Sequence, residues 1–188
     1  MAIRRVIKTK KGIYSSFCKA VKIDGAINKV HNIALRVNTP QMVDKSKIFA
    51  SVTSNGVTFT NNGDGTITIN GTATADTYKI YLTIPLPSND KVLIRGCPKG
   101  GTSKTYFIGS NKGGPTIDYG GGVITDLSTQ GTGSVLQYIM IKKGCVADNL
   151  IFRPETINLT QAFGEGNEPN SVEEAEAKLK DYIPYQYL

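Results

Sequence analysis

The stretch VTFTNNGDGTITINGTATA, residues 57–75, alternates apolar and polar residues on both sides of a turn sequence. Val57 and Phe59 alternate with threonines before the turn, and Ile67 and Ile69 alternate with threonines after it. The intervening Asn-Gly-Asp-Gly tolerates the positive φ angles of a tight turn. The pattern therefore predicts a β-hairpin with one apolar face, which we place at the opening edge of a β-sandwich.

Six further alternating or apolar runs follow the hairpin, separated by Gly, Pro, Asn and Ser. Short strands at this spacing predict an antiparallel jelly-roll β-sandwich of about eight strands. The expected fold class is therefore all-β, with a small N-terminal β-hairpin region and one short C-terminal α-helix. The predicted strands cover residues 78–86, 91–96, 104–110, 122–127, 135–144 and 148–154.

The C-terminal helix is predicted from the string SVEEAEAKLKDYIP. Ser171 is placed to cap it, acidic residues occupy its first turn and lysines its last, and Pro184 ends it. An apolar stripe along one face must pack on the sandwich or on a neighbouring copy. We predict a homo-oligomer, with a trimer favoured, and keep packing on its own sandwich as the alternative. The stripe consists of Val172, Ala175, Leu179 and Tyr182.

The formal net charge of +7 is distributed unevenly. Residues 1–50 hold 11 Lys and Arg against 2 Asp, whereas residues 155–188 hold 2 Lys and Arg against 7 acidic residues. A faint repeat around Gly12 and Gly25 reads as two small hairpins. Such hairpins are marginal alone and must lie on another surface.

We predict that residues 1–45 anchor the protein to a partner and that residues 36–51 form a linker into the sandwich. A strongly basic segment attracts acidic surfaces, and its strand-like alternation, without a nucleic-acid-binding motif, favours a protein over nucleic acid. The candidate attachment residues are Arg4, Arg5, Lys8, Lys10, Lys11, Lys19 and Lys22.

Little in the sequence points to catalysis or to a cofactor. The single histidine, His31, has no nucleophile motif near it. Cys18, Cys97 and Cys145 are odd in number and form no CxxC pair, which indicates neither disulfides nor a zinc site and suits a reducing cytoplasm. Cys97 and Cys145 follow strand segments and are predicted to be small buried residues. The glycine-rich stretches lack a phosphate-binding motif, and NNGDGT lacks the calcium ligand series. We expect no enzymatic activity, cofactor or metal.

The chain also lacks the features of a membrane or exported protein. No apolar run approaches the roughly 20 residues that span a bilayer. The basic N-terminus is not followed by the apolar stretch of a signal peptide. We therefore expect no membrane partner.

Carbohydrate binding is the alternative site prediction. Jelly-roll modules can stack aromatic side chains on sugar rings and hydrogen-bond them through Asp and Asn. The absence of Trp counts against such a site. The candidates near the glycine-rich loops are Tyr106, Phe107, Asn111, Asp118 and Tyr119.

Three stretches carry a family resemblance: NGDGTITINGTA (62–73), DNLIFRP (148–154) and LTQAFGEGNEP (159–169). Together they resemble a recurrent module of phage and prophage minor structural proteins, particularly those of tails and baseplates, over residues 44–188. The resemblance implies a carbohydrate-binding-module-like jelly roll with residues 148–154 as its last core strand. The expected domains are an anchoring region, the jelly roll and an appended loop and helix, at residues 1–45, 46–158 and 159–188.

The same resemblance implies a non-enzymatic virion component of the tail, baseplate or fibre, assembled in the host cytoplasm. Its N-terminal region would bind other virion proteins while the jelly roll projects. A capsid decoration or head-fibre protein would use the same plan, and a host-glycan-binding module is a further alternative.

Overall fold

The computed structural model describes residues 3–9, 12–18 and 40–180. The chain divides into two compact units, Met1–Leu35 and Arg36–Leu188, which we call the N-terminal unit and the sandwich unit. This division at residue 35 falls before the boundary at residue 45 that the sequence predicts. Residues 40–43 belong to the sandwich because they pair with one of its strands, as described below.

The N-terminal unit contains an antiparallel hairpin of β1 (Ile3–Thr9) and β2 (Gly12–Cys18). Thr9 is paired with Gly12, as expected for a turn next to that glycine. This agrees with the first of the two predicted hairpins. The second predicted hairpin, around Gly25, and the lone His31 lie outside the described residues.

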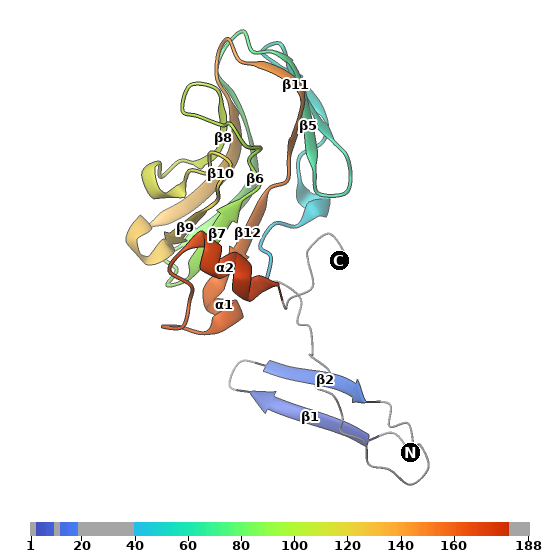
Figure 1. The fold of residues 1–188 in the computed structure, drawn as a ribbon, viewed down its shortest axis with the longest axis vertical. Coiled ribbons are helices and arrows are strands. Elements are labelled where there is room, and N and C mark those ends of the chain that lie inside the picture. Colours follow the sequence, from blue (N-terminus) through green and yellow to red (C-terminus); the bar gives the residue numbers. More distant parts are fainter. Residues whose placement is uncertain (1–2, 10–11, 19–39, 181–188) are drawn as a thin grey trace. The chain divides into compact units, whose positions relative to one another are not determined.

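In the described part of the sandwich unit, ten strands form three antiparallel sheets with the orders β11-β5-β4-β3, β6-β10-β8 and β12-β7-β9 (Figure 1). The prediction of an all-β sandwich with a short C-terminal helix is confirmed. The strands are β3 (Val52–Ser54), β4 (Val57–Asn61), β5 (Ile67–Thr72), β6 (Thr77–Leu86), β7 (Lys91–Arg95), β8 (Tyr106–Ser110), β9 (Val123–Asp126), β10 (Gly133–Ile141), β11 (Val146–Phe152) and β12 (Glu155–Asn158). Short 3₁₀ helices occupy Lys45–Lys47, Gly114–Thr116 and Leu127–Gln130.

The predicted hairpin is formed by β4 and β5, with Phe59 opposite Ile69. In its turn, the Asp64 carboxylate accepts hydrogen bonds from the hydroxyl and the backbone N–H of Thr66, and these bonds lower the pKa of Asp64. The predicted position at the sheet edge is wrong. β3 pairs with the outer side of β4 through Val52, so β4 and β5 are inner strands of a four-stranded sheet.

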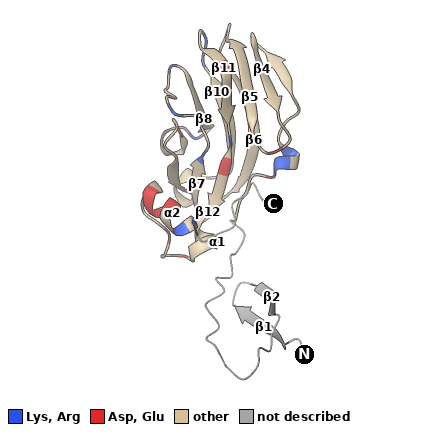
Figure 2. Ribbon diagram, turned by 45° about the vertical axis from the view of Figure 1, so that its right-hand side comes forward, with Lys and Arg blue, Asp and Glu red and all other residues tan. Residues whose placement is uncertain are grey.

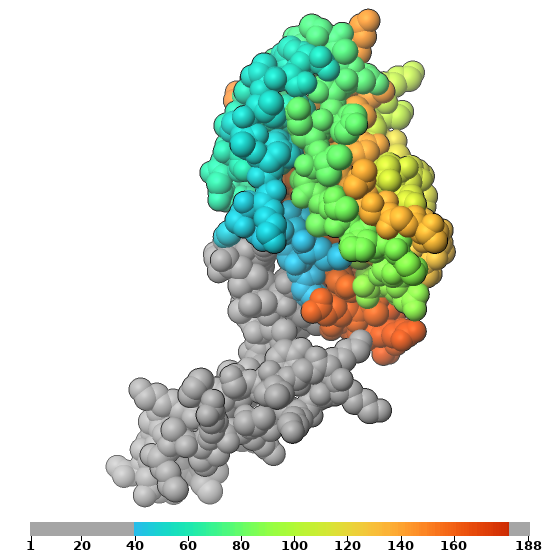
Figure 3. All heavy atoms as spheres, turned by 180° about the vertical axis from the view of Figure 1, so that it is seen from behind, coloured from blue at the N-terminus to red at the C-terminus, as the bar shows by residue number. Residues whose placement is uncertain are grey.

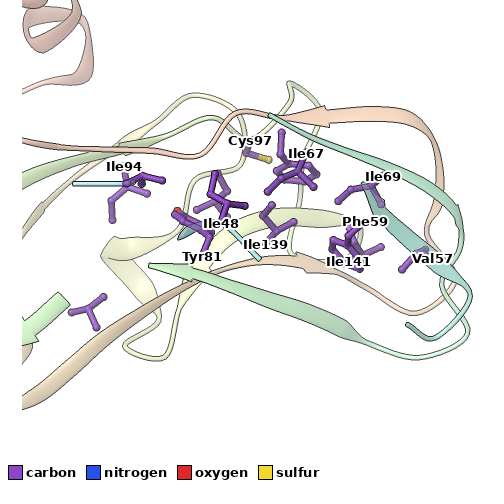
Figure 4. Packing of buried hydrophobic residues seen from close by; sticks show 14 of the residues in the cluster. Ile48, Val57, Phe59, Ile67, Ile69, Tyr81, Ile94, Cys97, Ile139 and Ile141 are labelled. Carbon is purple, nitrogen blue, oxygen red and sulfur yellow. The ribbon is translucent and has the colours of Figure 1, made fainter. Parts of the chain in front are cut away.

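Apolar side chains from all three sheets meet in one main core (Figure 4). Period-two alternation explains why each strand contributes to it, because every second side chain points inward. In Figure 1, β8 and β10 lie across this core from β5 and β11. Core side chains with no exposed surface include Val57, Phe59, Ile67, Ile69, Ile108, Ile139, Ile141 and Phe152.

The last strand of the sandwich is β12, so the prediction that residues 148–154 form the last core strand is wrong. β11 pairs with β5, and after Arg153 and Pro154 the chain continues as β12, which pairs with β7. Between β11 and β12, the Arg153 N–H donates at 2.9 Å to the carbonyl of Gly96, the residue that follows β7. Gly96 has φ +114°, and a Cβ there would lie 1.8 Å from the Arg153 oxygen, so only glycine permits this approach.

Residues 40–43 pair with the edge of β12 and do not form part of a linker. Met42 N–H donates to the Thr156 carbonyl at 2.7 Å, and the Gln41 side chain accepts from Thr156 N–H at 2.7 Å. Val43 is 1% exposed in the main core. The sandwich therefore begins earlier than the sequence pattern indicated.

Two helices, α1 (Leu159–Phe163) and α2 (Val172–Leu179), follow β12. As predicted, the Ser171 hydroxyl caps α2 by accepting from Glu174 N–H at 3.1 Å. α1 was not predicted. Among the described residues, no helix is long and apolar enough to cross a membrane.

The apolar stripe of α2 packs on the sandwich of its own chain. Ala175 and Leu179 are buried beside Leu93 of β7 and Ile157 of β12, and Val172 packs at the margin of this second cluster. This packing agrees with the alternative prediction, in which the stripe packs on its own sandwich. The predicted homo-oligomer contact through these residues stays a prediction. Tyr182, the fourth predicted member, lies outside the described residues.

Candidate functional site

The outer face of the sheet β6-β10-β8 carries exposed aromatic side chains. Along β10, Gln137, Ile139 and Ile141 are fully buried, whereas Tyr138 and Met140, which alternate with them, point to the other face and are half-buried. Met140 lies between Tyr78 of β6 and Phe107 of β8 in the strand register. One outward row of side chains thus crosses all three strands.

Four rings on this face form what we call the aromatic strip: Tyr78, Tyr138, Phe107 and Tyr119. The ring centroids of Tyr78 and Tyr138 are 5.2 Å apart, and those of Phe107 and Tyr119 are 5.6 Å apart. Tyr119 lies beside β8 because its neighbour Asp118 forms a β-bridge with Ile108. The strip therefore extends from β6, across β10 and β8, to the segment that contains Tyr119.

Gly109 allows the two ring pairs to meet. A Cβ at this position would lie 2.8 Å from a ring carbon of Phe107 and 3.2 Å from a ring carbon of Tyr138. Both rings therefore cover the backbone of Gly109, where a side chain would otherwise stand. The absence of a side chain at residue 109 is thus a structural requirement of the strip.

The strip is partly open to solvent. Tyr78 is 54% exposed and Tyr119 is 39% exposed, whereas Phe107, between Tyr119 and Tyr138, is only 9% exposed. Strands β6 and β10 lie side by side, green and orange, on the face seen in Figure 3. The surface thus offers exposed tyrosine rings at its two ends and a more covered ring between them.

The Tyr138 hydroxyl is held in its uncharged form at neutral pH. Burial raises the pKa of Tyr138, the neighbouring Tyr78 raises it further, and Lys142 has the opposite effect. The Tyr138 hydroxyl donates to the carbonyl of Ser110 at 3.1 Å. Lys142 forms an ion pair with Asp76, so its charge is largely compensated. Such a surface suits stacking against an apolar or carbohydrate ring face and offers no reactive group.

The structure brings together two of the five predicted glycan-binding residues, Phe107 and Tyr119. Tyr106 lies on the opposite side of β8, where its ring packs edge-on against Phe152 at 6.0 Å. Its hydroxyl donates to the Lys99 carbonyl at 2.9 Å. Tyr106 therefore supports the core, and its predicted place in a glycan site is wrong.

The polar members of the predicted site hold the backbone. Asn111 accepts from Leu136 N–H at 2.8 Å and donates to the Ser134 carbonyl at 3.1 Å, which ties its turn to β10. Asp118 is 1% exposed. Its two oxygens accept from three backbone N–H groups, those of Cys97, Gly120 and Gly122, at 2.7–2.9 Å. The assignment of Asp118 to a glycan site is therefore wrong, because its carboxylate is buried and occupied by these bonds.

Cys97 is a buried thiol, as predicted for a small core residue. Burial, and then the nearby Asp118 carboxylate, raise its pKa to about 12. The thiolate needed for nucleophilic chemistry is therefore scarce at neutral pH. Cys145 is half-buried against the main core, and burial also raises its pKa.

Within residues 40–180 the structure places no three His, Cys, Asp or Glu side chains where they could hold a metal ion.

A polar group also lies inside the core. The Gln137 side-chain oxygen accepts from the Tyr81 hydroxyl at 2.9 Å and from the Thr156 hydroxyl at 2.6 Å. These hydrogen bonds link β10 to β6 and to β12. Burial raises the pKa of Tyr81. These side chains have no exposed surface that a ligand could reach, apart from 6% at Tyr81, so we assign them a structural role.

The predicted attachment residues are only partly covered by the structure. Arg4, Arg5 and Lys8 lie in β1. Lys10, Lys11, Lys19 and Lys22 lie outside the described residues. Their proposed role stays a prediction.

The sequence reasoning missed Tyr78 and Tyr138 as site residues. The string YKIYL does contain a usable signal, since Tyr78 and Ile80 fall on the face opposite Tyr81 if the strand alternates. Alternation alone does not say which face is buried.

A scan of protein-family models finds no match to this chain, and searches of curated proteins and of solved structures find none either.

Proposed function

We propose that the protein is a non-enzymatic structural component of a phage virion, associated with the tail, baseplate or fibre. Its N-terminal unit would attach to other virion proteins and its sandwich unit would project. The proposal rests on the resemblance of residues 44–188 to phage minor structural proteins, together with the way charge divides between the two units. A capsid decoration protein with the same plan is the alternative location.

The charge division is the observation that carries this proposal. The N-terminal unit holds eight Lys and Arg against one Asp, a net charge of +7, whereas residues 36–188 hold 14 against 14, a net charge of zero. All of the net charge of the chain therefore belongs to the small unit. The charged residues of the sandwich unit are of both signs, with acids gathered on α2 (Figure 2). Because the N-terminal unit is basic and the sandwich unit is neutral, attachment to an acidic particle surface is favoured through the N-terminal unit.

Labelling of particles tests the proposed location. Antibodies raised against the sandwich unit should decorate virions made by the strain that encodes the chain, at the tail or baseplate. Labelling of the head would favour the capsid alternative. Particles that contain none of the protein would overturn the proposal.

Charge neutralisation tests the attachment. In the full-length chain, Gln would replace the seven candidate attachment residues named above, and incorporation into particles should fall by about tenfold or more. A matched control would replace Lys47, Lys99 and Lys104, exposed residues of the neutral unit, and should incorporate normally. Normal incorporation of the neutralised chain would contradict attachment through charge.

The aromatic strip favours a second candidate function, binding of a host-surface glycan. Exposed aromatic rings on a sheet surface stack on the apolar faces of sugar rings. Replacing Tyr78 with Ser should weaken binding on a glycan array by about tenfold, the effect of losing one aromatic stacking contact. Ile151→Ser is the matched control, because Ile151 on β11 is also 54% exposed but lies outside the strip. Equal effects of both changes, or no binding by the unaltered chain, would contradict this second function.

A further inference from the structure

The sequence contains three Asn-Gly pairs, Asn55-Gly56, Asn62-Gly63 and Asn70-Gly71. In such a pair the backbone nitrogen of glycine can attack the side-chain amide carbon of asparagine. The new C–N bond closes a succinimide ring, the bond to the amide nitrogen breaks, and ammonia leaves with the proton of the N–H group. Water then opens the ring to aspartate or isoaspartate. The reaction needs a free glycine N–H and a free side-chain amide that can approach each other.

The pair Asn70-Gly71 is held by the sheet. It lies inside β5, where Gly71 is paired with Val57 on one side and with Ala147 on the other. The side-chain oxygen of Asn70 accepts from Asn149 N–H at 2.7 Å. Attack by the Gly71 nitrogen would require the inner strand to separate from its neighbours.

The pair Asn62-Gly63 lies in the exposed turn between β4 and β5, yet each of its reacting groups is bonded. The side-chain amide nitrogen of Asn62 donates to the hydroxyls of Thr66 and Thr68, both at 2.9 Å. Gly63 N–H donates to the side-chain oxygen of Asn61 at 2.9 Å. Three hydrogen bonds must therefore break before the ring can close.

The pair Asn55-Gly56 forms the turn between β3 and β4, with φ +48° and +80°. Both residues are exposed. Within the part of the chain that the structure describes, Gly56 N–H has no hydrogen-bond partner. The Asn55 side-chain amide has a single long contact, 3.4 Å to the carbonyl of Asp76. We infer that Asn55 is a site of spontaneous deamidation in the folded protein, and that the other two pairs are protected.

Modification at this turn has a structural consequence. Isoaspartate adds one carbon to the main chain, and this turn has no spare room, because the Gly56 Cα faces the Thr72 carbonyl so closely that a Cβ would stand 2.3 Å from it. Thr74 N–H also donates to the Asn55 carbonyl at 2.8 Å. Chains that carry isoaspartate should therefore lose the pairing of β3, the edge strand of its sheet.

Peptide mapping of the aged full-length protein tests the inference. The chain would be held at mildly alkaline pH, and aspartate and isoaspartate would be quantified at each pair by mass spectrometry. Asn55 should convert at least about tenfold faster than Asn62, since hydrogen bonds protect only the latter. In denaturant the three rates should become similar, because the local sequences are alike.

The comparison of the three deamidation rates uses the unaltered chain and needs no variant. Asn55→Gly, which keeps a positive φ, should in addition remove most of the early ammonia release. Equal rates at Asn55 and Asn62 in the folded protein, or faster conversion at Asn62, would overturn the inference. So would a rate difference that persists in denaturant, because the cause would then be sequence and not structure.

Discussion

The two outer faces of the sandwich differ, although their inner faces are alike. On the sheet β11-β5-β4-β3 the outward positions of β3, β4 and β5 are polar, with Thr58 opposite Asn70 and Thr60 opposite Thr68. On the sheet β6-β10-β8 the outward positions carry the aromatic strip. Inward, both sheets supply fully buried aliphatic and aromatic side chains to one core.

The two outer faces differ in the kind of side chain that they expose to water. Threonines suit a half-exposed strand and can bond one another, as Thr53 and Thr58 do at 2.9 Å between their hydroxyl oxygens. Across β3, β4 and β5 that face is polar, and the exposed Ile151 lies apart from these strands, on β11. Exposed tyrosines such as Tyr78 leave apolar surface in water, which is typical of a binding surface. The glycan binding proposed above is therefore placed on the aromatic face.

The largest effect should come from the inner face. Phe59→Ala removes a ring with no exposed surface and should lower the free energy of unfolding by about 3–5 kcal/mol, measured by urea unfolding of the full chain. Thr60→Ala, the next residue on the outer face, is the matched control and should change it by about 0.5 kcal/mol or less. Similar losses from both changes would mean that the outer threonines are part of the packing.

A smaller effect should come from crowding the aromatic face. Gly109→Ala places a Cβ against Phe107 and Tyr138 and should cost about 1–3 kcal/mol of stability, with a changed near-ultraviolet circular dichroism of tyrosine. Gly121→Ala meets no atom within 4 Å and has an ordinary φ, so it should be neutral. A neutral Gly109→Ala would show that the two ring pairs do not depend on this glycine.

The smallest effect concerns the turn on the polar face. Because bonds from Thr66 lower the pKa of Asp64 below its ordinary value of 3.8, its stabilising contribution is complete above that pH and is lost as the pH falls through the lower folded value. The stability difference between the wild-type chain and Asp64→Asn should therefore shrink in acid. A difference that stays constant down to about pH 2 would contradict this role of the carboxylate.

The local features were predictable because they depend on neighbours in the sequence. Alternation of Val57 and Phe59 with threonines was enough to predict the hairpin. A hydroxyl residue three positions before a glutamate was enough to predict the cap at Ser171. The site was only partly predictable. Phe107 and Tyr119 were identified, whereas the carboxylate of Asp118 is bonded by the backbone N–H groups of Gly120 and Gly122 in its own loop and of the distant Cys97.

The sequence by itself determined an all-β chain with a capped helix near its end and with its net charge at its beginning. Only the tertiary structure decided which faces are covered. Leu93 points away from the main core, yet it is buried because α2 packs over β7. Val43 is buried because residues 40–43 pair with β12. The physical reason is that hydrogen bonding within a turn or strand is local, whereas burial depends on which distant segments come to lie against each side chain.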